Sequence, residues 1–479
     1  MSMQPVTRVR GMYDLRWESW RRKRTMQDAL CSTLAGYGYE FLETPLLEGT
    51  ELFLRQSGGD LASRMYSFVD AGSNQVSLRP EFTSPIMRHF LEDGSCALPA
   101  RFQYAGPVFR YDVAHPEGSG QFTQVGAELI GASGLVADAE LLTLAADLAA
   151  RAGLADYRIE LADLDVFHSI LDVARISDRA RGFILASIPQ LRLGPQALPE
   201  VRERAGQLHL DDRNSEYQEL SAAITGLDDD QARQVIQGFL QWNSTDIRHF
   251  GQRDPQQVVD RFLRKLRGSD EMGRLEQGLE LAARMAGIRG EPHEALAATR
   301  AVVSTSGAYS PALDRLEELM EILESCAETR GKVTVDFGLA RGLAYYNGIV
   351  FEVRHPDWPA PLGGGGRYDG LARALGSQVD VPASGFAYTL ETLLALAERE
   401  EVSERPKPIC ETVLVVAGSS SVAGLALDEA RKLRGQGLVV ELEVGGRDLE
   451  QSRSYASQQG IGRMVYIDSA GELTACNVE

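Results

Sequence analysis

The pattern of apolar and polar positions predicts a β-rich core that is interrupted by a helical block. Apolar residues recur at helical spacing over 15–36 and over 137–153, which predicts two helices. Alternating runs at 101–112 and 121–131 predict two strands, and the sequence VAHPEGSGQ between them is rich in turn-forming residues. Further strands are expected at 39–45, 157–163, 332–340 and 348–355.

The helical block extends over residues 165–330 and carries many charged residues. Because β-type patterns lie on both sides of it, we expect an insertion between the two parts of one core, residues 1–164 and 331–403. A proline- and charge-rich linker follows at 404–408. Residues 409–479 then show a β-α-β-α-β pattern, which predicts a small, mostly parallel α/β domain. The overall class is α+β.

Composition narrows the class of protein without naming it. The 479 residues allow two or three domains, and 44% hydrophobic and 24% charged content are ordinary for a globular protein. No apolar stretch is long enough to span a bilayer, and the first residues have no apolar signal core, so a cytoplasmic location is expected. Five scattered cysteines without ligand spacing predict neither zinc nor disulfides. The net charge of -19 argues against a dedicated nucleic-acid binder.

Three segments carry the candidate chemistry. They are SLRPEFT at 77–83, RGLAYYNGIVFE at 341–352 and PLGGGGRYDGL at 361–371. Carboxylate, phenol and guanidinium groups beside glycines suit a small polar ligand. The glycines at 363–366 are not followed by Lys-Ser/Thr, so we expect a tight hairpin that lines the ligand site and not a phosphate-binding P-loop.

Together these motifs resemble those of the histidyl-tRNA synthetase family. RGMYD opens the resemblance, and YGYEFLETPLLE is similar to the dimer-forming first motif of class II synthetases. FRYD with QFTQVGAELIG resembles the second motif, and GGGGRYDGL with GFAYTLETL resembles the third. The resemblance covers about residues 8–160 and 331–400. It implies a class II antiparallel sheet core, an anticodon-binding-like C-terminal domain and a homodimer that forms around Pro45.

The resemblance also assigns roles to single residues. The positions that hold histidine in the family keep their residue types here: Glu81, Thr83, Gln124, Glu128, Tyr345 and Tyr346. Acidic and amide oxygens suit the ammonium and imidazole donors of histidine. Arg110 matches the second-motif arginine that holds the substrate carboxylate and phosphate, and Arg341 matches the catalytic arginine of the histidyl type.

The positions that handle ATP in the family depart from its pattern. Thr392 stands where the third motif ends in an arginine, and the turn from Val113 through Gly118 to Gly120 contains no Arg or Lys. Guanidinium groups are the usual partners of a triphosphate, so this loss predicts weaker ATP binding. Phe82, where a small residue is usual, is expected to crowd the site.

A kept amino-acid site beside an eroded ATP site indicates a non-enzymatic, histidine-binding regulatory subunit of ATP phosphoribosyltransferase, which acts in histidine biosynthesis. This interpretation implies a short catalytic phosphoribosyltransferase chain as partner, no tRNA, no membrane, no cofactor and no metal. The alternative is a histidine–tRNA ligase with an altered ATP site, which would use ATP and magnesium and have Arg110 and Arg341 as catalytic residues. A third reading is a free-standing paralogue that binds histidine or a similar ligand.

Simpler structural interpretations stay open for several of these residues. Glu81 and Glu128 could be buried partners of Arg79 or Arg110 without any ligand. Adjacent strand residues face opposite sides, so at least one tyrosine of the pair at 345–346 is expected to be core packing.

Overall fold

The computed structural model describes residues 6–55, 59–111, 120–208, 227–243, 272–339, 346–400 and 412–478, together with residues 210, 223, 259 and 263. They group into two compact units. The first comprises residues 1–165, 290–296 and 311–479, and the second comprises residues 166–289 and 297–310. The division of the chain into four segments drawn from the sequence stays a prediction.

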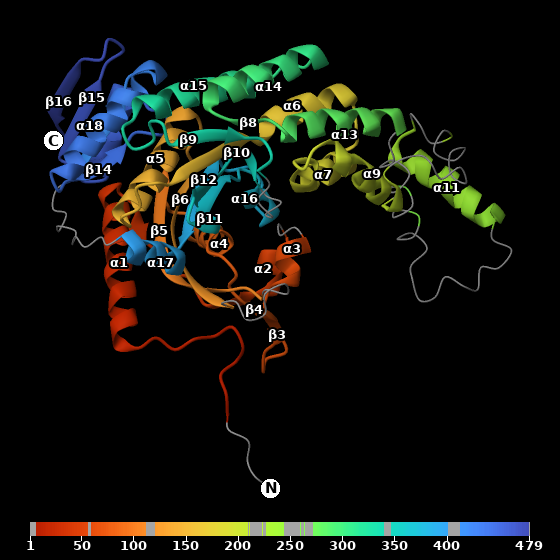
Figure 1. Ribbon diagram of the computed structural model, residues 1–479, viewed down its shortest axis with the longest axis horizontal. Helices are drawn as coiled ribbons and strands as arrows, with labels where there is room; N and C mark the ends of the chain where they lie inside the picture. The colour runs from red at the N-terminus through yellow and green to blue at the C-terminus, as the bar shows by residue number, and fades with distance from the viewer. Residues whose placement is uncertain are drawn as a thin grey trace, which may run out of the picture. The chain divides into compact units, whose positions relative to one another are not determined.

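A nine-stranded sheet forms the centre of the first unit, in the order β1-β5-β6-β12-β11-β10-β7-β9-β8 (Figure 1). Its strands are β1 (Glu40–Phe41), β5 (Ala100–Phe109), β6 (Gln121–Ile130), β7 (Arg158–Asp163), β8 (Arg289–Gly290), β9 (Val333–Asp336), β10 (Asn347–His355), β11 (Trp358–Arg367) and β12 (Ala383–Thr389). The ladders from β5 to β7 are antiparallel, whereas β1 pairs with β5 and β7 pairs with β9 in parallel. This mixed sheet confirms the α+β class.

Helices cover the two faces of this sheet differently. The helices of the first unit are α1 (Trp17–Gly36), α2 (Thr50–Leu54), α3 (Gly59–Ser63), α4 (Thr83–Asp93), α5 (Leu135–Arg151), α15 (Pro311–Ser325), α16 (Leu371–Ala374) and α17 (Leu390–Glu400). Tyr388 of β12 donates a hydrogen bond to the Ala145 carbonyl oxygen at 2.7 Å, so α5 lies on that face. On the other face, α4 contributes Ile86 and Met87 to a core with Tyr104 of β5. That second face carries the candidate site.

Two smaller sheets complete the first unit. Strands β2 (Leu47–Gly49), β3 (Ser67–Val69) and β4 (Gln75–Leu78) pair in the order β2-β4-β3. The C-terminal segment of the first unit contains β13 (Thr412–Ala417), α18 (Ala423–Gly435), β14 (Val439–Leu442), α19 (Leu449–Gln458), β15 (Arg463–Ile467) and β16 (Leu473–Asn477). The three predicted parallel strands are present, and β16 adds an antiparallel edge that the sequence pattern did not predict.

The second unit is built from helices wherever the structure describes it. They are α7 (Asp178–Ala186), α8 (Ile188–Leu191), α9 (Leu198–Gln207), α11 (Asp229–Asn243) and α13 (Met272–Ala286), with a short 3-10 turn at Pro195–Ala197. Helices α6 (Leu164–Ala174) and α14 (Pro292–Ser306) continue from the first unit into it. In the described part of the chain, no helix has the length and apolar character needed to cross a membrane.

Two local predictions are wrong. The strand expected at 39–45 is limited to Glu40–Phe41. The glycines at 363–366 form no hairpin, because they lie inside β11 and pair with residues 385–388 of β12. Glycine allows β11 and β12 to pair closely here. A Cβ atom on Gly365 would lie 1.9 Å from the Gly385 carbonyl oxygen.

Candidate functional site

The segment SLRPEFT forms the connection between β4 and α4. The Arg79 guanidinium anchors it, because its Nε donates to the Pro107 carbonyl oxygen at 2.9 Å. The Phe82 ring stacks on Tyr104 with ring centroids 4.3 Å apart. Phe82 is therefore a packing residue that holds this connection against β5.

Glu128 is the centre of the candidate site. Its carboxylate is buried on β6 and accepts hydrogen bonds from Thr83 Oγ1 at 2.8 Å and from the Tyr104 hydroxyl at 3.0 Å, both on Oε1. The Tyr368 hydroxyl donates to Oε2. Three hydroxyl groups from α4, β5 and the end of β11 therefore converge on one carboxylate.

Burial sets the ionisation of this carboxylate. It raises the pKa of Glu128 to about 8, although the three hydroxyl donors act in the opposite direction, and the charge of Glu81 raises the pKa further. A cation placed beside Glu128 would oppose both effects. The site thus favours a positively charged or hydrogen-donating ligand.

Glu81 lies at the start of α4, next to Thr83. It is buried, and both carboxylate oxygens accept from the Ser84 backbone N–H, at 3.2 and 3.1 Å. Burial raises the pKa of Glu81, whereas the bonds from Ser84 and the charge of Arg110 lower it. Arg79, one of the two partners considered for Glu81, is instead directed to main-chain oxygens.

The floor below Glu128 requires glycine. A Cβ atom on Gly385 would lie 1.6 Å from Glu128 Oε2, and a Cβ atom on Gly126 would lie 2.2 Å from the Phe386 carbonyl oxygen. Neither position can accept a side chain unless Glu128 or the backbone moves. Gly385 thus gives the Glu128 carboxylate the space that it occupies, and Gly126 leaves room for the Tyr104 hydroxyl that bonds to it.

Gln124 and Tyr346 lie on the same face of the sheet. Gln124 is two residues from Gly126 on β6, and its side-chain Oε1 is buried without a hydrogen-bond partner. A Cβ on Gly366 would lie 3.0 Å from Tyr346 Cδ1, and Tyr346 packs against the core that contains Tyr104. The buried Gln124 oxygen could accept a donor from a ligand.

Arg110 follows the last residue of β5 and lies at the edge of the cluster. Its Nε donates to the Pro80 carbonyl oxygen at 2.8 Å, and its guanidinium lies over the Phe122 ring, 5.3 Å from the centroid. Its backbone N–H donates to the Gly120 carbonyl oxygen at 2.9 Å. Arg110 is thus positioned beside Glu81, from the other side of the α4 connection.

Part of the predicted site cannot be compared with the structure. Arg341 and Tyr345 lie outside the described residues, and so do Val113 and Gly118. Thr392, in the first turn of α17, is half-buried. The structure brings together four of the eight predicted residues, Glu81, Thr83, Arg110 and Glu128, and it places Gln124 and Tyr346 on the same face of the sheet.

Sequence reasoning missed Tyr104 and Tyr368, which both bond to Glu128. The sequence position of each tyrosine could have indicated its place near the site. Tyr104 lies two residues from Phe102 on one face of β5, and Tyr368 directly follows the glycine run and Arg367. Their common target could not be deduced, because it depends on the pairing of distant strands.

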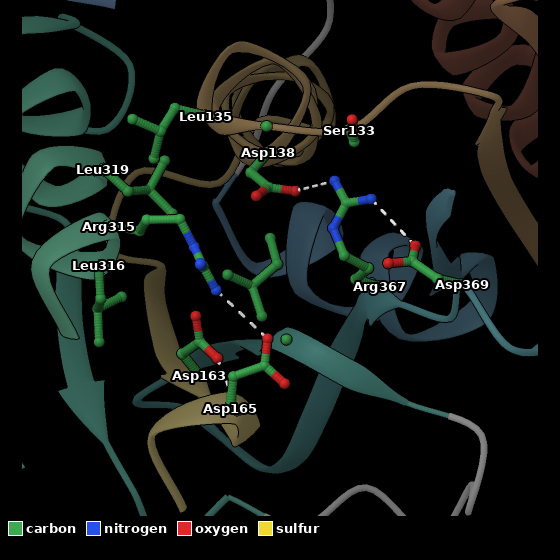
Figure 2. A pocket seen from close by; sticks show the side chains of 13 residues that line it. Ser133, Leu135, Asp138, Asp163, Asp165, Arg315, Leu316, Leu319, Arg367 and Asp369 are labelled. Carbon is green, nitrogen blue, oxygen red and sulfur yellow. Dashed lines mark hydrogen bonds and ion pairs between the residues drawn. The ribbon is translucent and has the colours of Figure 1, made fainter. Parts of the chain in front are cut away.

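The two neighbours of Tyr368 in the chain, Arg367 and Asp369, take part in ion pairs on the opposite face of the sheet (Figure 2). Arg367 donates to Asp369 Oδ1 at 3.1 Å and to Asp138 of α5 at 2.5 Å. Asp369 also accepts from the Ala383 backbone N–H at 2.9 Å. The residues on either side of Tyr368 are therefore held in place, and its hydroxyl is directed to Glu128.

Asp138, Arg367 and Asp369 also line a cavity of about 280 Å³ (Figure 2). Asp163 and Asp165 line it together with Arg315, which lies 3.4 Å from Asp165. Burial raises the pKa of Asp163 to about 7. The cavity is separated from Glu128 by the sheet.

Glu391 connects the start of α17 to three other parts of the chain. It accepts from Lys23 Nζ at 2.7 Å, from the Tyr13 hydroxyl at 2.7 Å and from the Thr123 backbone N–H at 2.8 Å. These bonds tie the RGMYD segment and α1 to β6. They place Thr392, the next residue, close to the strand that carries Gln124 and Glu128.

The arrangement is suited to bind a ligand with several donors. Two buried carboxylates, an amide oxygen without a partner and an arginine at the edge can hold an amino acid with a donor side chain through its ammonium, side chain and carboxylate. The sheet, with its antiparallel β5-β6-β12-β11-β10 centre, has the class II aminoacyl-tRNA synthetase-like fold that was expected.

Residues 11–237 and 254–393 match the family model described as Histidyl-tRNA synthetase, and the chain belongs to this family. Curated relatives match along nearly the whole chain. The histidine–tRNA ligase of Methanocaldococcus jannaschii is 27% identical over 461 residues, which cover 96% of this chain and 91% of the relative. That of Thermococcus kodakarensis is 26% identical over 486 residues, which cover 98% and 94%.

Solved structures support the same fold. An ATP phosphoribosyltransferase regulatory subunit/histidyl-tRNA synthetase from Bacillus halodurans has a TM-score of 0.55 at 20% identity, covering 97% of this chain and 98% of its own. The histidyl-tRNA synthetase from Nostoc sp. PCC 7120 also has a TM-score of 0.55, at 16% identity, covering 99% and 97%. At these identities the likeness concerns the fold alone.

The interpretation as a regulatory subunit of ATP phosphoribosyltransferase is wrong. The curated relatives that cover 96% of the chain or more are histidine–tRNA ligases, and their matches are too long to omit the C-terminal domain. The error has a physical cause. Thr392 stands where the family has an arginine, and the loss of that arginine weakens the affinity for ATP. Weaker binding of a substrate does not by itself define a different reaction.

Proposed function

We propose that this protein is a histidine–tRNA ligase, which joins L-histidine to its tRNA at the expense of ATP. The observation that carries the proposal is the buried Glu128 carboxylate, surrounded by three hydroxyl donors, with Glu81 and the unpaired Gln124 oxygen on the same side of the sheet. The curated relatives with that activity support it.

Histidine would be held by its donors. Its ammonium and imidazole N–H groups would donate to Glu81, Glu128 and Gln124. An ionised carboxylate and an amide oxygen accept hydrogen bonds and donate none. Burial has already removed water from Glu128, so an ammonium gains a strong charge-assisted hydrogen bond there. An apolar amino acid would leave these groups unpaired, which is the basis of selectivity.

The histidine carboxylate would then attack the α-phosphate of ATP. The new bond joins a carboxylate oxygen to phosphorus, and the bond between the α- and β-phosphates breaks to release pyrophosphate. Arg110, near Glu81 at the edge of the cluster, would offset the negative charge on the α-phosphate. The resemblance gives Arg341 the same task. In a second step, a ribose hydroxyl of the tRNA would displace AMP from the adenylate.

Weak binding of ATP is part of the proposal. Thr392 offers a hydroxyl in place of a guanidinium, and the sequence from 113 to 120 contains no Arg or Lys. We therefore expect a high KM for ATP with the chemistry intact. No group of three acidic, histidine or cysteine side chains able to hold a metal occurs in the described ranges. Magnesium would accompany the ATP phosphates as part of the substrate.

Histidine-dependent exchange of pyrophosphate into ATP tests the first step. The purified chain should catalyse exchange with histidine and not with alanine or phenylalanine, and Glu128→Gln should abolish it. Absence of exchange at saturating ATP would refute the proposal.

A further inference from the structure

A second cavity, of about 690 Å³, lies where β7 and β9 begin and β10 ends. Arg158, Arg330, Lys332 and Arg354 line it, together with Asp156 and Glu160. Tyr346 precedes β10 and Arg354 is near the end of that strand. Eight residues of extended chain separate the two, about 26 Å. The cavity is therefore remote from the Glu128 cluster.

The cations of this cavity form a row across three neighbouring strands. Arg354 of β10 is directly opposite Arg158 of β7. Lys332 precedes β9, which runs parallel to β7, and the backbone N–H of Ile159 donates to the Lys332 carbonyl oxygen at 2.9 Å. Like charges directly opposite each other on adjacent strands destabilise a sheet. A row of three cations therefore lowers the stability of the sheet, and a nearby negative charge would offset this effect.

Only one member of the row is neutralised by the protein. Arg354 forms ion pairs with Glu160 at 2.9 Å and with Glu352 at 2.7 Å. Arg158 and Lys332 have no ion pair with a carboxylate anywhere in the part of the chain that the structure describes. Arg158 donates to the Gly331 carbonyl oxygen, and Lys332 Nζ lies 3.9 Å from the centroid of the Tyr157 ring.

A third cation, Arg330, also forms no direct ion pair among the described residues, although its charge acts on Asp428. Arg330 donates to the carbonyl oxygens of Glu324 and Ser325, at 2.9 and 2.8 Å, which fixes the guanidinium without neutralising it. Burial and the charge of Arg158 lower the pKa of Lys332, whereas the charge of Asp156 acts in the opposite direction. Three cations that form no direct ion pair among the described residues thus line one cavity in a protein whose net charge is -19.

We propose that this cavity, lined by Arg158, Arg330 and Lys332, is a binding site for a phosphate group. A phosphate with two negative charges offsets the row better than a single carboxylate, and guanidinium groups match its oxygens. The phosphate could belong to a phosphorylated small molecule or to the backbone of an RNA. The inference does not depend on the chemistry at Glu128.

Inorganic phosphate is the first probe. Its binding to the full-length protein is measured by calorimetry and thermal unfolding, against sodium chloride at equal ionic strength. The double variant Arg158→Gln/Lys332→Gln is compared with Arg24→Gln/Arg373→Gln, which removes two cations that pair with Asp28 and Asp380 elsewhere. Lys332→Met is a further variant, because it keeps the packing on Tyr157 and removes the charge.

The site predicts that phosphate raises the melting temperature of the wild type and of the control variant. Arg158→Gln/Lys332→Gln should lose about tenfold or more in phosphate affinity. In phosphate-free buffer it should be at least as stable as the wild type, because repulsion within the row is removed. Equal phosphate responses in the wild type, the control and Lys332→Met would overturn the proposal.

Two further probes distinguish the source of the phosphate. A nucleoside 5′-monophosphate represents small phosphorylated molecules, and a tRNA transcript represents the RNA backbone. If Arg158→Gln/Lys332→Gln weakens binding of the tRNA, the backbone is the source. If it weakens only the monophosphate, the ligand is small. If it weakens neither, the cavity is not a phosphate site.

Discussion

The Thr83 hydroxyl donates a hydrogen bond to the Glu128 carboxylate at 2.8 Å, which joins the first residue of α4 to the centre of the sheet. This bond connects two motifs that are 45 residues apart in the chain. It also places a hydroxyl where it can hold the ionised form of Glu128, the form that an ammonium ligand requires.

Replacing Thr83 by valine should therefore weaken histidine binding. Hydrogen bonds to charged groups contribute about 1.5–3 kcal/mol, so a loss of about tenfold or more in affinity is expected, with little change in the fold. Thr83→Ser keeps the hydroxyl and is the matched control. Calorimetric titration with histidine measures both variants, and equal losses in the two would show that the methyl group, and not the bond, matters.

The raised pKa of Glu128, about 8, predicts a specific pH dependence of stability. In the unfolded chain this group ionises near its ordinary pKa of about 4.3. Between that pH and 8, the unfolded state loses the proton while the folded state keeps it. The contribution of Glu128 to stability is thus present at low pH and is lost as pH rises, by up to about 1.4 kcal/mol per pH unit.

Glu128→Gln cannot ionise, so it should gain stability relative to the ligand-free wild type between pH 5 and pH 8. Thermal unfolding of both proteins is measured across this range. The difference in their free energies of unfolding at each pH isolates the effect of Glu128. A constant difference at all pH values would contradict the buried, mostly protonated carboxylate.

Histidine binding should release a proton at neutral pH. The ligand ammonium favours the ionised Glu128, whose pKa of about 8 in the free protein means that it is mainly protonated at pH 7. Affinity should consequently rise from pH 6.5 to pH 8. Calorimetry in two buffers of different ionisation enthalpy counts the released proton, and Glu128→Gln is the control that should release none from this position.

Gly385→Ala should remove histidine binding. The added methyl group would lie 1.6 Å from Glu128 Oε2 and 2.7 Å from the Ala127 carbonyl oxygen, so both the carboxylate and the backbone must shift. Gly370→Ala is the control, because no atom lies within 4 Å of the Cβ that it would add. Equal histidine affinity in the two variants, measured by titration, would show that Glu128 is not where the ligand binds.

Thr392→Arg should lower the KM for ATP. The substitution places a guanidinium at the start of α17, where the resemblance to class II synthetases implies a contact with the triphosphate. A reduction of about tenfold is expected if one charge-assisted hydrogen bond forms. Steady-state pyrophosphate exchange separates the KM for ATP from that for histidine, and only the first should change.

The sequence allowed most strands of the main sheet to be predicted, together with the elements that carry several candidate site residues, because each lies in a short motif with a strong local signal. That these residues bind histidine stays a prediction. SLRPEFT and QFTQVGAELIG place Glu81, Thr83, Gln124 and Glu128 in the right elements without knowledge of the contacts. The face of β6 that carries Glu128 and Gln124 also follows from the alternation of strand residues.

The hydrogen-bond partners of Glu128 could not be predicted in the same way. Tyr104 and Tyr368 reach it only because β5, β6, β12 and β11 pair in one register, and register depends on contacts between distant segments. The strand through Gly363–Gly366 was missed for a related reason. Glycine usually signals a turn, and its role of admitting a close neighbour becomes visible only when that neighbour is present.

Aminoacylation of histidine tRNA by the purified chain tests the central claim most directly. The reaction contains saturating ATP and magnesium, and acid-stable incorporation of labelled histidine into tRNA is followed with time. The account predicts histidine-specific charging that requires Glu128 and is lost in Glu128→Gln, with a high KM for ATP. No charging by the wild-type protein, or equal charging by Glu128→Gln, would contradict it.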